Sequence, residues 1–529
     1  MSEETIKKPK SGRLAERTAG NAVWNIVPLV WSTALNVVAL PMIIRKLGFA
    51  DYGMYGVFAL FLAPLTLANL GFGEATIKYV AQHAARGETP QAARYIRTTF
   101  FMNLTVGLGG ALFLAFAGAP LAFKLASIPA VKQEMVRHCF YCVAAGWVGI
   151  QVTGVFMGVP SAFQNFKAVA LTQVLTGTFT TGLALGAVLG GGGLLGYTMA
   201  TATGSMVTAV SWYGVSRKIF GPVSLTPKLF RDAWRASFRF GGWQALAQVG
   251  GMAANQIERV IIAGLFSGTK PLGYFNNARS IEERLYFLVF KMSEVLFPLF
   301  SQLSEENLAQ KADKLMRASW LLTSLAVTVL APLIPLAKPL LTIYINAEAG
   351  EHVATLLRVM ALAGILGCAS NASYFYLLGH GRTEWTALIS IATGVATVVA
   401  SLVLLPLFGF KAAALPSVLA MLVQQYFLGF RMLPAVFEHQ ISKWRVFASL
   451  YSPLVAALPV ATLVWMAQPE RFIRGFATLI PAYAVVSALC LGMILAVNRF
   501  LKRGLQQEQD LARLFQWGQQ ALRSRLGRN

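Results

Sequence analysis

Ionisable side chains are concentrated between residues 258 and 294, in a stretch that is otherwise strongly apolar. If this stretch crosses a membrane, each charge at mid-bilayer costs about 2.5–3.5 kcal/mol by insertion scales, so these residues are functional candidates by default. Basic side chains on a cavity wall could replace the hydration shell of a phosphate or pyrophosphate group. The group contains four basic and four acidic residues: Arg259, Arg279, Arg284, Lys291, Glu258, Glu282, Glu283 and Glu294.

The spacing of these charges supports two interpretations. Lys291 and Glu294 are three residues apart and share a helical face, with Arg284 one heptad before Lys291. The charges could therefore neutralise one another, Glu258 with Arg259 and Lys291 with Glu294. We favour neutralisation slightly for the individual residues and a polar cavity for the group as a whole. Glu258 and Glu294 are also candidates for carrying a coupling proton.

Amide side chains supply further candidates. Gln244, Gln248 and Asn255 recur at intervals of four and seven residues, which places them on one face of a predicted helix that could line a cavity. Such amides more often bridge neighbouring helices. Three polar residues within or after the first two apolar segments are further candidates: Asn25, Arg45 and Glu74. Charged residues at helix ends also anchor membrane helices by snorkelling, which is the alternative interpretation of Arg45 and Glu74.

Several chemistries are not visible in the sequence. The phosphate-binding motif GxxxxGK[ST] is absent, so we expect no ATP hydrolysis. The five histidines are scattered, which argues against a metal cluster. Cys139 and Cys142 form a CxxC pair without a second pair, and packing cysteines are the better interpretation. We therefore predict no catalytic residue, metal or cofactor, and a transporter rather than an enzyme.

The elements that position the candidates are membrane helices. The 529 residues are 56% hydrophobic and 13% charged, with a mean hydropathy of +0.57, whereas soluble domains carry about 25% charged residues. The net charge of +23 does not indicate a nucleic-acid partner, because the basic residues lie in the tails and between apolar blocks. Anionic lipids and the positive-inside rule favour them there. We predict an all-α integral membrane protein.

Intervals free of charge mark most of the expected helices, since a spanning helix needs about 20 apolar residues. The interval 168–216 is too long for one span and breaks at the glycine run 190–193, which gives two helices. The seventh and eighth helices contain charges and are separated by a turn that holds more of them. Fourteen transmembrane helices result: 18–44, 52–73, 98–123, 138–166, two within 168–216, 240–266, 285–303, 318–337, 359–381, 385–410, 412–430, 446–469 and 475–498.

The fourteen spans predict the domain organisation and the orientation. An even count puts both termini on one side of the membrane, and lysine and arginine are denser on that side, which predicts cytoplasmic termini. The first apolar segment is too long for a signal peptide, so we expect it to be retained. The expected parts are a basic N-terminus at 1–17, an N-lobe of six helices at 18–216, a basic linker at 217–239, a C-lobe of six helices at 240–430, two C-terminal helices at 446–498, and a basic amphipathic tail at 499–529 that lies on the membrane surface or is solvated.

A short internal repeat relates the two lobes. The segments IIRKLGFADYGMYG (43–56) and IIAGLFSGTKPLGYF (261–275) share an Ile-Ile pair, a following Leu, a Gly and an aromatic residue. Six helices lie within one period, so both copies enter the membrane in the same sense. Parallel repeats of this kind predict two bundles related by an axis along the membrane normal, with the substrate path between them.

Four segments resemble the Wzx-type polysaccharide-flippase branch of the multidrug/oligosaccharidyl-lipid/polysaccharide (MOP) exporter superfamily: LGFADYGMYG after the first span, NLGFGEATIKYVAQ after the second, and IERVIIAGLFSGTKPLGYFNNARSI and VLFPLFSQLSEE in the second half. The resemblance spans nearly the whole chain through loose, structural motifs. The chain departs from the family at Glu258, where many members carry an aspartate, and in its longer C-terminal tail.

This resemblance implies a flippase that moves an undecaprenyl-pyrophosphate-linked oligosaccharide from the cytoplasmic to the periplasmic leaflet of a bacterial inner membrane, for surface polysaccharide assembly. It implies alternating access by the two lobes, with the sugar and pyrophosphate in the cavity and the polyprenyl tail in lipid beside the last two helices. The implied partners are the lipid-linked oligosaccharide and membrane lipids, with a polysaccharide polymerase and a chain-length regulator as further candidates. We expect a monomer.

Two other functions remain open. A drug or cation antiporter of the same superfamily would share the architecture, but its cavity should be net acidic, which four basic against four acidic residues do not favour. A membrane polysaccharide polymerase or ligase usually needs a sizeable periplasmic loop, and none is evident in the sequence. The neighbouring genes would discriminate, because a flippase should be encoded beside glycosyltransferases and a polymerase.

Overall fold

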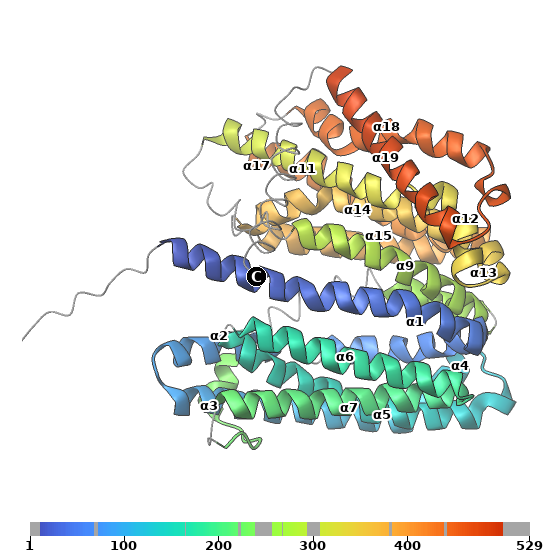
Figure 1. Ribbon diagram of the computed structural model, residues 1–529. Coiled ribbons are helices and arrows are strands. Elements are labelled where there is room, and N and C mark those ends of the chain that lie inside the picture. The colour runs from blue at the N-terminus through green and yellow to red at the C-terminus, as the bar shows by residue number, and fades with distance from the viewer. Residues whose placement is uncertain are drawn as a thin grey trace, which may run out of the picture. The chain divides into compact units, whose positions relative to one another are not determined.

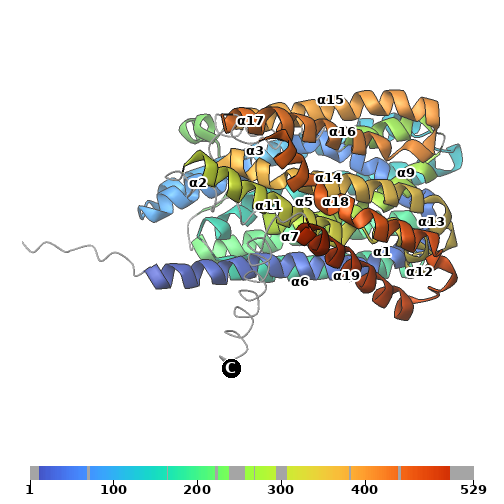
Figure 2. The same ribbon diagram turned by 90° about the horizontal axis from the view of Figure 1, so that it is seen from above.

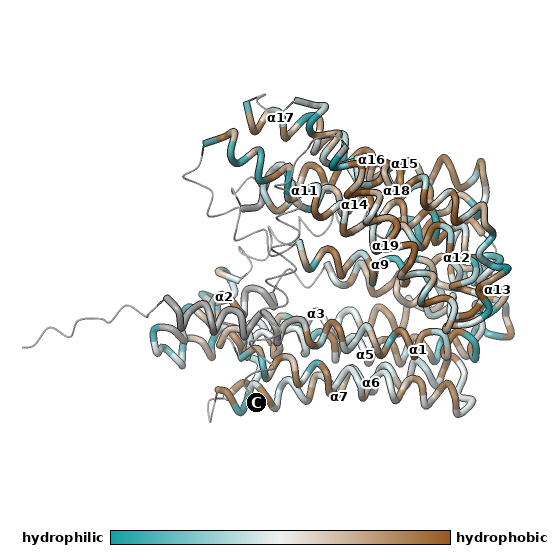
Figure 3. The backbone as a smooth tube through the Cα atoms, turned by 45° about the horizontal axis from the view of Figure 1, so that its top comes forward, coloured by the Kyte–Doolittle hydropathy of each residue, from teal (hydrophilic) through white to brown (hydrophobic). Residues whose placement is uncertain are grey.

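The structure is a computed structural model that describes residues 11–67, 72–163, 165–220, 224–237, 256–266, 268–293, 307–379, 383–438 and 442–500. Regular structure in these ranges is entirely helical, which confirms the predicted all-α class. Ten of the described helices are long and apolar enough to cross a membrane. Figure 3 shows hydrophobic colour along the helices, with hydrophilic colour gathered mainly near their ends. The total of fourteen spans stays a prediction.

The chain forms two compact units. Unit 1 comprises Met1–Val249 and Phe266–Gly273, and unit 2 comprises Gly250–Leu265 and Tyr274–Asn529. The finer boundaries predicted for lobes, linker and tail stay predictions. The described helices of unit 1 are α1 (Ser11–Leu67), α2 (Phe72–Ala85), α3 (Thr89–Phe113), the π-helical turn η1 (Leu114–Gly118), α4 (Ala119–Leu125), α5 (Ala130–Ala162), α6 (Phe166–Leu189) and α7 (Gly193–Phe220).

Unit 2 contains most of α9 and the helices that follow it. Their bounds are α9 (Lys270–Ser293), α11 (Leu308–Leu330), α12 (Leu333–Tyr344), α13 (Ala347–His352), α14 (Ala354–Gly379), α15 (Thr383–Phe408), the 3-10 turn η3 (Phe410–Ala412), α16 (Leu415–Gln425), the π-helical turn η4 (Tyr426–Met432), α17 (Leu433–Val436), α18 (Lys443–Met466), the 3-10 turn η5 (Pro469–Arg471) and α19 (Phe476–Phe500).

The first two predicted spans form one helical run, α1, with a kink at Gly48. Gly48 has φ 79° and ψ 163°, a backbone conformation essentially confined to glycine. The chain therefore changes direction at Gly48 without leaving the helical run for a loop. Residues 45–51, which lie between the predicted spans, are consequently part of α1.

A reciprocal close contact joins the second part of α1 to the start of α9, inside unit 1. A Cβ placed on Gly53 would lie 1.8 Å from the carbonyl oxygen of Thr269, and one on Gly273 would lie 2.2 Å from that of Phe49. Thr269 also donates its hydroxyl to the Ala50 carbonyl over 2.6 Å. The two backbones meet so closely because both positions are glycine.

The predicted break in the interval 168–216 is confirmed. Helix α6 ends at Leu189 and α7 begins at Gly193, with Gly191 and Gly193 at φ 86° and 56°. At its start, α6 is capped by the Asn165 side chain, which accepts from the Ala168 amide. Helix α7 packs along α5, and α6 packs against α1 and α7, with α6 in teal and α7 in green in Figure 1.

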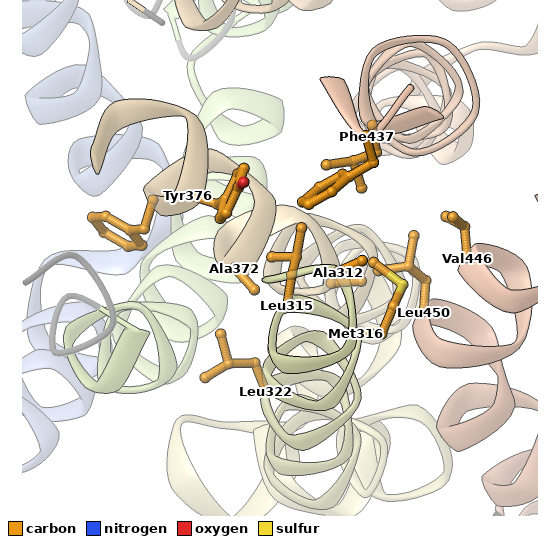
Figure 4. Close-up of a cluster of buried hydrophobic side chains, with 12 residues drawn as sticks. Ala312, Leu315, Met316, Leu322, Ala372, Tyr376, Phe437, Val446 and Leu450 are labelled. Atoms are coloured by element: carbon orange, nitrogen blue, oxygen red, sulfur yellow. The ribbon is translucent and has the colours of Figure 1, made fainter. Parts of the chain in front are cut away.

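Unit 2 is held by an apolar core between α11, α14, α17 and α18. Its buried side chains include Leu315 and Met316 from α11, Tyr376 from α14, and Leu450 from α18, with Phe437 directly after α17 (Figure 4). Helices α15 and α16 pack against each other beside α14, as Figure 2 shows. Phe290 of α9, the helix that carries most polar candidates of unit 2, packs against this core.

The predicted start of the eighth span is wrong. The sequence analysis placed this span at 285–303 behind a turn rich in charges, whereas α9 is already helical from Lys270. Charged residues can continue a membrane helix when they pair along it, and Arg279 lies within reach of Glu282 and Glu283 at spacings of three and four residues. The charges assigned to a turn therefore lie on a helix.

Candidate functional site

The charged candidates of unit 2 form a paired network on α9 and on the helical residues 256–265. Arg279 Nε donates to Glu283 Oε1 over 2.8 Å, and Arg279 Nη1 lies 3.8 Å from Glu282 Oε2. Arg259 Nη2 lies 3.5 Å from the same Glu283 oxygen, and its Nη1 donates to Gln256 over 2.9 Å. Arg259 and Arg279 thus have carboxylates as neighbours, which favours neutralisation for these two residues.

Glu258 and Glu282 are carboxylates enclosed by protein. Glu258 is 2% exposed, and Oε1 accepts a 2.7 Å hydrogen bond from Ser417 at the start of α16. Glu282 is 4% exposed and lies against α14, where a Cβ on Gly364 would be 2.5 Å from its Oε1. Buried carboxylates need partners of this kind, because an isolated charge in an apolar medium is very unfavourable.

Arg284 is a basic candidate with a hydrogen-bond donor, Nη1, that the network does not use. Its Nη1 atom is buried and has no hydrogen-bond partner among the described residues. One heptad further along α9, the Lys291 ammonium lies 5.2 Å from the centroid of the Phe287 ring. Asn277, on the same helix, has both amide atoms buried without a partner in the described part of the chain. These donors on α9 could bind an anionic group.

The structure does not place the remaining predicted residues relative to this network. Arg45 is exposed on α1, three residues before the kink, and belongs to unit 1. The other predicted residues, or their side chains, lie outside the described part of the structure: Asn25, Glu74, Gln244, Gln248, Asn255 and Glu294. No group of three or more His, Cys, Asp or Glu side chains among the described residues is arranged to hold a metal ion.

A second candidate is a cavity of about 440 Å³ inside unit 1. Four helices form it: α1, α5, α6 and α7. Hydroxyl, amide and indole side chains make up the polar part of its wall: Trp31, Ser32, Asn36, Thr153, Gln173, Thr176, Thr180, Thr181, Ser205, Thr208 and Trp212. None of the described residues that line this cavity carries a formal charge.

Sequence reasoning missed this cavity because it looked for charges. A signal was present in the segment TGTFTTG (176–182), where hydroxyl residues and glycines replace the large apolar side chains of an ordinary span. Close packing positions part of this segment, since a Cβ on Gly204 of α7 would lie 2.4 Å from the Thr180 hydroxyl of α6. Ser417, the partner of Glu258, was also missed, because its role depends on a contact between distant helices.

Comparisons with known proteins identify relatives of the chain. A family model described as "polysaccharide biosynthesis protein" matches residues 19–304. The structure resembles the lipid II flippase MurJ in an inward closed conformation, with a TM-score of 0.70 and 12% identity over 90% of this chain and 99% of that one. It also resembles an inward-facing multidrug transporter of the MATE family and MOP superfamily, with a TM-score of 0.65 and 15% identity over 79% and 99% of the two chains.

A further structural relative is a MOP-superfamily transporter from Pyrococcus furiosus, with a TM-score of 0.56 and 16% identity over 79% of this chain and 96% of that one. No curated protein sequence matches the chain significantly. At these identities the structural likeness establishes the fold, while the family match confirms the resemblance drawn from the sequence motifs.

Proposed function

Because the chain belongs to the polysaccharide biosynthesis protein family, we propose that it is a lipid-linked oligosaccharide flippase of a bacterial inner membrane. Its substrate is an undecaprenyl-pyrophosphate-linked repeat unit, which it moves from the cytoplasmic to the periplasmic leaflet. The observation that carries this proposal is the family match over residues 19–304, more than half of the chain. The fold shared with a protein named as a lipid II flippase supports the same class of substrate.

Such a flippase must move a polar head group through hydrocarbon. Sugar hydroxyls and a pyrophosphate lose their water there, and each polar group left without a partner costs several kcal/mol. Polar side chains within the helices replace those contacts in this proposal, with Arg284 and Lys291 as the groups for pyrophosphate. The polyprenyl tail stays in lipid, and the protein alternates between states open to either side.

Reconstitution tests the proposal directly. The purified chain is placed in liposomes that contain a fluorescent polyprenyl-pyrophosphate-linked oligosaccharide, and a membrane-impermeant glycosidase removes every sugar exposed outside. We expect the protein to raise the cleaved fraction from the outer-leaflet share to nearly the whole pool, while protein-free liposomes stay at the outer-leaflet share.

The same liposomes distinguish the alternative suggested by the likeness to a multidrug transporter. If the oligosaccharide stays inaccessible while an ion gradient drives the uptake of ethidium, the chain is a cation antiporter and the flippase proposal fails. A polysaccharide polymerase and a chain-length regulator are the proposed protein partners, and co-purification with the tagged chain from its native membrane tests them.

A further inference from the structure

The cavity of unit 1 has the dimensions of a small-molecule site. Its volume of about 440 Å³ lies within the range of about 300–1,000 Å³ typical of such sites. Hydroxyl and amide groups interrupt its largely apolar lining, which separates it from the dry voids of a purely apolar core. Four helices contribute to its wall, so the polar groups converge on one space instead of forming a stripe along a single helix.

The hydroxyls of the wall act mainly as acceptors toward this space. A hydroxyl carries one proton and two lone pairs, so a hydroxyl that donates to the main chain has only acceptor capacity left for a ligand. Four lining hydroxyls donate to carbonyls of their own helix: Ser32 to Leu29 over 3.1 Å, Thr176 to Thr172 over 2.7 Å, Ser205 to Thr201 over 3.0 Å, and Thr208 to Gly204 over 2.7 Å.

Two other side chains of the wall differ from these four hydroxyls. Asn36 donates its amide to the Ser32 carbonyl over 2.8 Å, which leaves the amide oxygen as an acceptor. The Thr153 hydroxyl oxygen is buried and has no hydrogen-bond partner among the described residues.

This wall selects a class of ligand. An anion is disfavoured, because the wall offers acceptors and none of the described lining residues is basic. An organic cation would enter without a carboxylate to balance its charge, at a large desolvation cost. A neutral sugar ring fits, because its hydroxyls donate to the acceptors and its C–H face can lie on an indole, whose π-face is electron-rich. Trp31, which is 45% exposed, supplies the indole.

We propose that the cavity between α1, α5, α6 and α7 is a subsite for an uncharged saccharide ring of the transported glycolipid. The inference rests on the proposed function, since it takes the ligand to be part of the lipid-linked substrate. It adds that the sugar is bound by neutral groups of unit 1 and the pyrophosphate by other, basic groups.

Gly177 on α6 allows the subsite to be probed with little disturbance of the fold. It lines the cavity, and a Cβ placed on it would meet nothing within 4 Å. The full chain with Gly177→Cys is embedded in lipid nanodiscs, without glycoside detergent, and alkylated with N-ethylmaleimide. Mass spectrometry follows each cysteine separately, so the partly exposed native Cys142 provides an internal reference in the same molecule.

Methyl hexosides at high millimolar concentration are expected to slow alkylation at position 177 at least threefold and to leave the rate at Cys142 unchanged. Glucuronate, the same kind of ring with a carboxylate, and tetraphenylphosphonium, an organic cation, are expected to give no protection. Protection by tetraphenylphosphonium without protection by hexosides would overturn the proposal in favour of a cation site. Alkylation that no ligand slows would overturn it as well.

A transport measurement separates this inference from the proposed function. Gly177→Leu fills the cavity, whereas Gly182→Leu adds the same side chain to the same helix at a position that also has open space but does not line the cavity. In the liposome assay we expect Gly177→Leu to slow flipping at least tenfold and Gly182→Leu to stay within twofold of the wild type. If the wild type flips and Gly177→Leu flips equally fast, the subsite is wrong and the flippase stands. If the wild type flips no lipid-linked oligosaccharide, the proposed function itself is wrong, and the subsite inference that rests on it is withdrawn.

Discussion

The reciprocal contact between Gly53 and Gly273 shows how much a single residue can decide in this chain. Each glycine faces a carbonyl oxygen of the other segment, at distances that no β-carbon can occupy. The contact brings residues 49–53 against residues 269–273 and so fixes where α9 begins relative to α1 in unit 1.

Gly53→Ala is therefore expected to destabilise the protein, because its Cβ would lie 1.8 Å from the Thr269 carbonyl oxygen and the backbones would have to separate. Overpacking of this kind costs about 1–3 kcal/mol. A lowered apparent unfolding temperature in detergent would report the loss. Gly109→Ala in α3 is the matched control, since its Cβ would meet nothing within 4 Å and should leave that temperature unchanged or raise it.

Arg284 and Lys291 carry the prediction about the pyrophosphate. We expect Arg284→Gln combined with Lys291→Gln to reduce oligosaccharide flipping to background, because the head group loses the cations that replace its hydration. The protein should remain inserted and monodisperse in size-exclusion chromatography. Arg471→Gln combined with Arg474→Gln removes two exposed cations instead and should flip normally. Normal flipping by the first double variant would contradict an anion site on α9.

At the scale of helices, the charge-free intervals and the repeat make different predictions for the eighth span. The distribution of charges gives 285–303, because Arg279, Glu282, Glu283 and Arg284 were assigned to a turn before it. The offset between Gly53 and Gly273, applied to the start of the second span at residue 52, gives a start at residue 272, and α9 is helical from Lys270. The sequence therefore contained the correct boundary. A rule that penalises charges could not use it, since charges paired along a helix do not end it.

Other helical details depend on packing that a sequence does not display. The π-helical turn η1 ends at Gly118, where a Cβ would lie 2.5 Å from the ring of Phe140 on α5. An extra residue in the helical turn at this point follows from that close approach. No local residue pattern distinguishes Leu114–Gly118 from the rest of its span, so the turn could not be predicted. The break after α6 could be predicted, because a run of glycines indicates a break from the local sequence alone.

The kink of α1 gives a prediction in which steric crowding plays no part. Gly48 has open space around its Cβ position, but its φ of 79° with ψ of 163° is strained for any other residue. Gly48→Ala is expected to cost about 1–3 kcal/mol through the backbone alone. Thermal unfolding measures the loss, and Gly214→Ala on α7, with equal space and without a positive φ, should cause none. Equal stability of both variants would show that α1 does not need this kink.

At the scale of the whole molecule, composition was sufficient to predict a helical membrane protein. A charged content of 13% leaves too little polar surface for a water-soluble protein of 529 residues, and the helical fold agrees. The count of spans was harder to predict. Helix α7 is missing from the ten apolar candidates because serine, threonine and glycine make up much of it, and two of those residues, Ser205 and Thr208, line the cavity of unit 1.

The candidate site was predicted only in part. The sequence placed Glu258, Arg259, Arg279 and Glu282 in one group, and the structure brings them close together because α9 and residues 256–265 are near in the chain. The cavity of unit 1 draws on four helices separated by many residues. Its threonines resemble ordinary membrane-helix threonines until α1, α5, α6 and α7 are seen together.

The orientation of the chain is a prediction for the molecule as a whole. Green fluorescent protein fused after Asn529 should fluoresce, because the positive-inside rule places the tail in the cytoplasm. Alkaline phosphatase fused after Gly191, in the break between α6 and α7, should be active, since five predicted spans precede it. Active phosphatase at the C-terminus together with inactive phosphatase at Gly191 would reverse the assignment.

The contact between Gly53 and Gly273 also has a consequence for the history of the chain. Residue 53 meets residue 269, and residue 273 meets residue 49, so the same offset of 220 residues relates both halves of the contact. Reciprocity of this form defines an isologous interface, in which two copies of one surface pair with each other. A half-length ancestor that dimerised symmetrically would have contained this contact across its interface. Fusion of its duplicated gene would have turned it into a contact within one chain, in which two separate codons encode the glycines that one codon encoded in the ancestor.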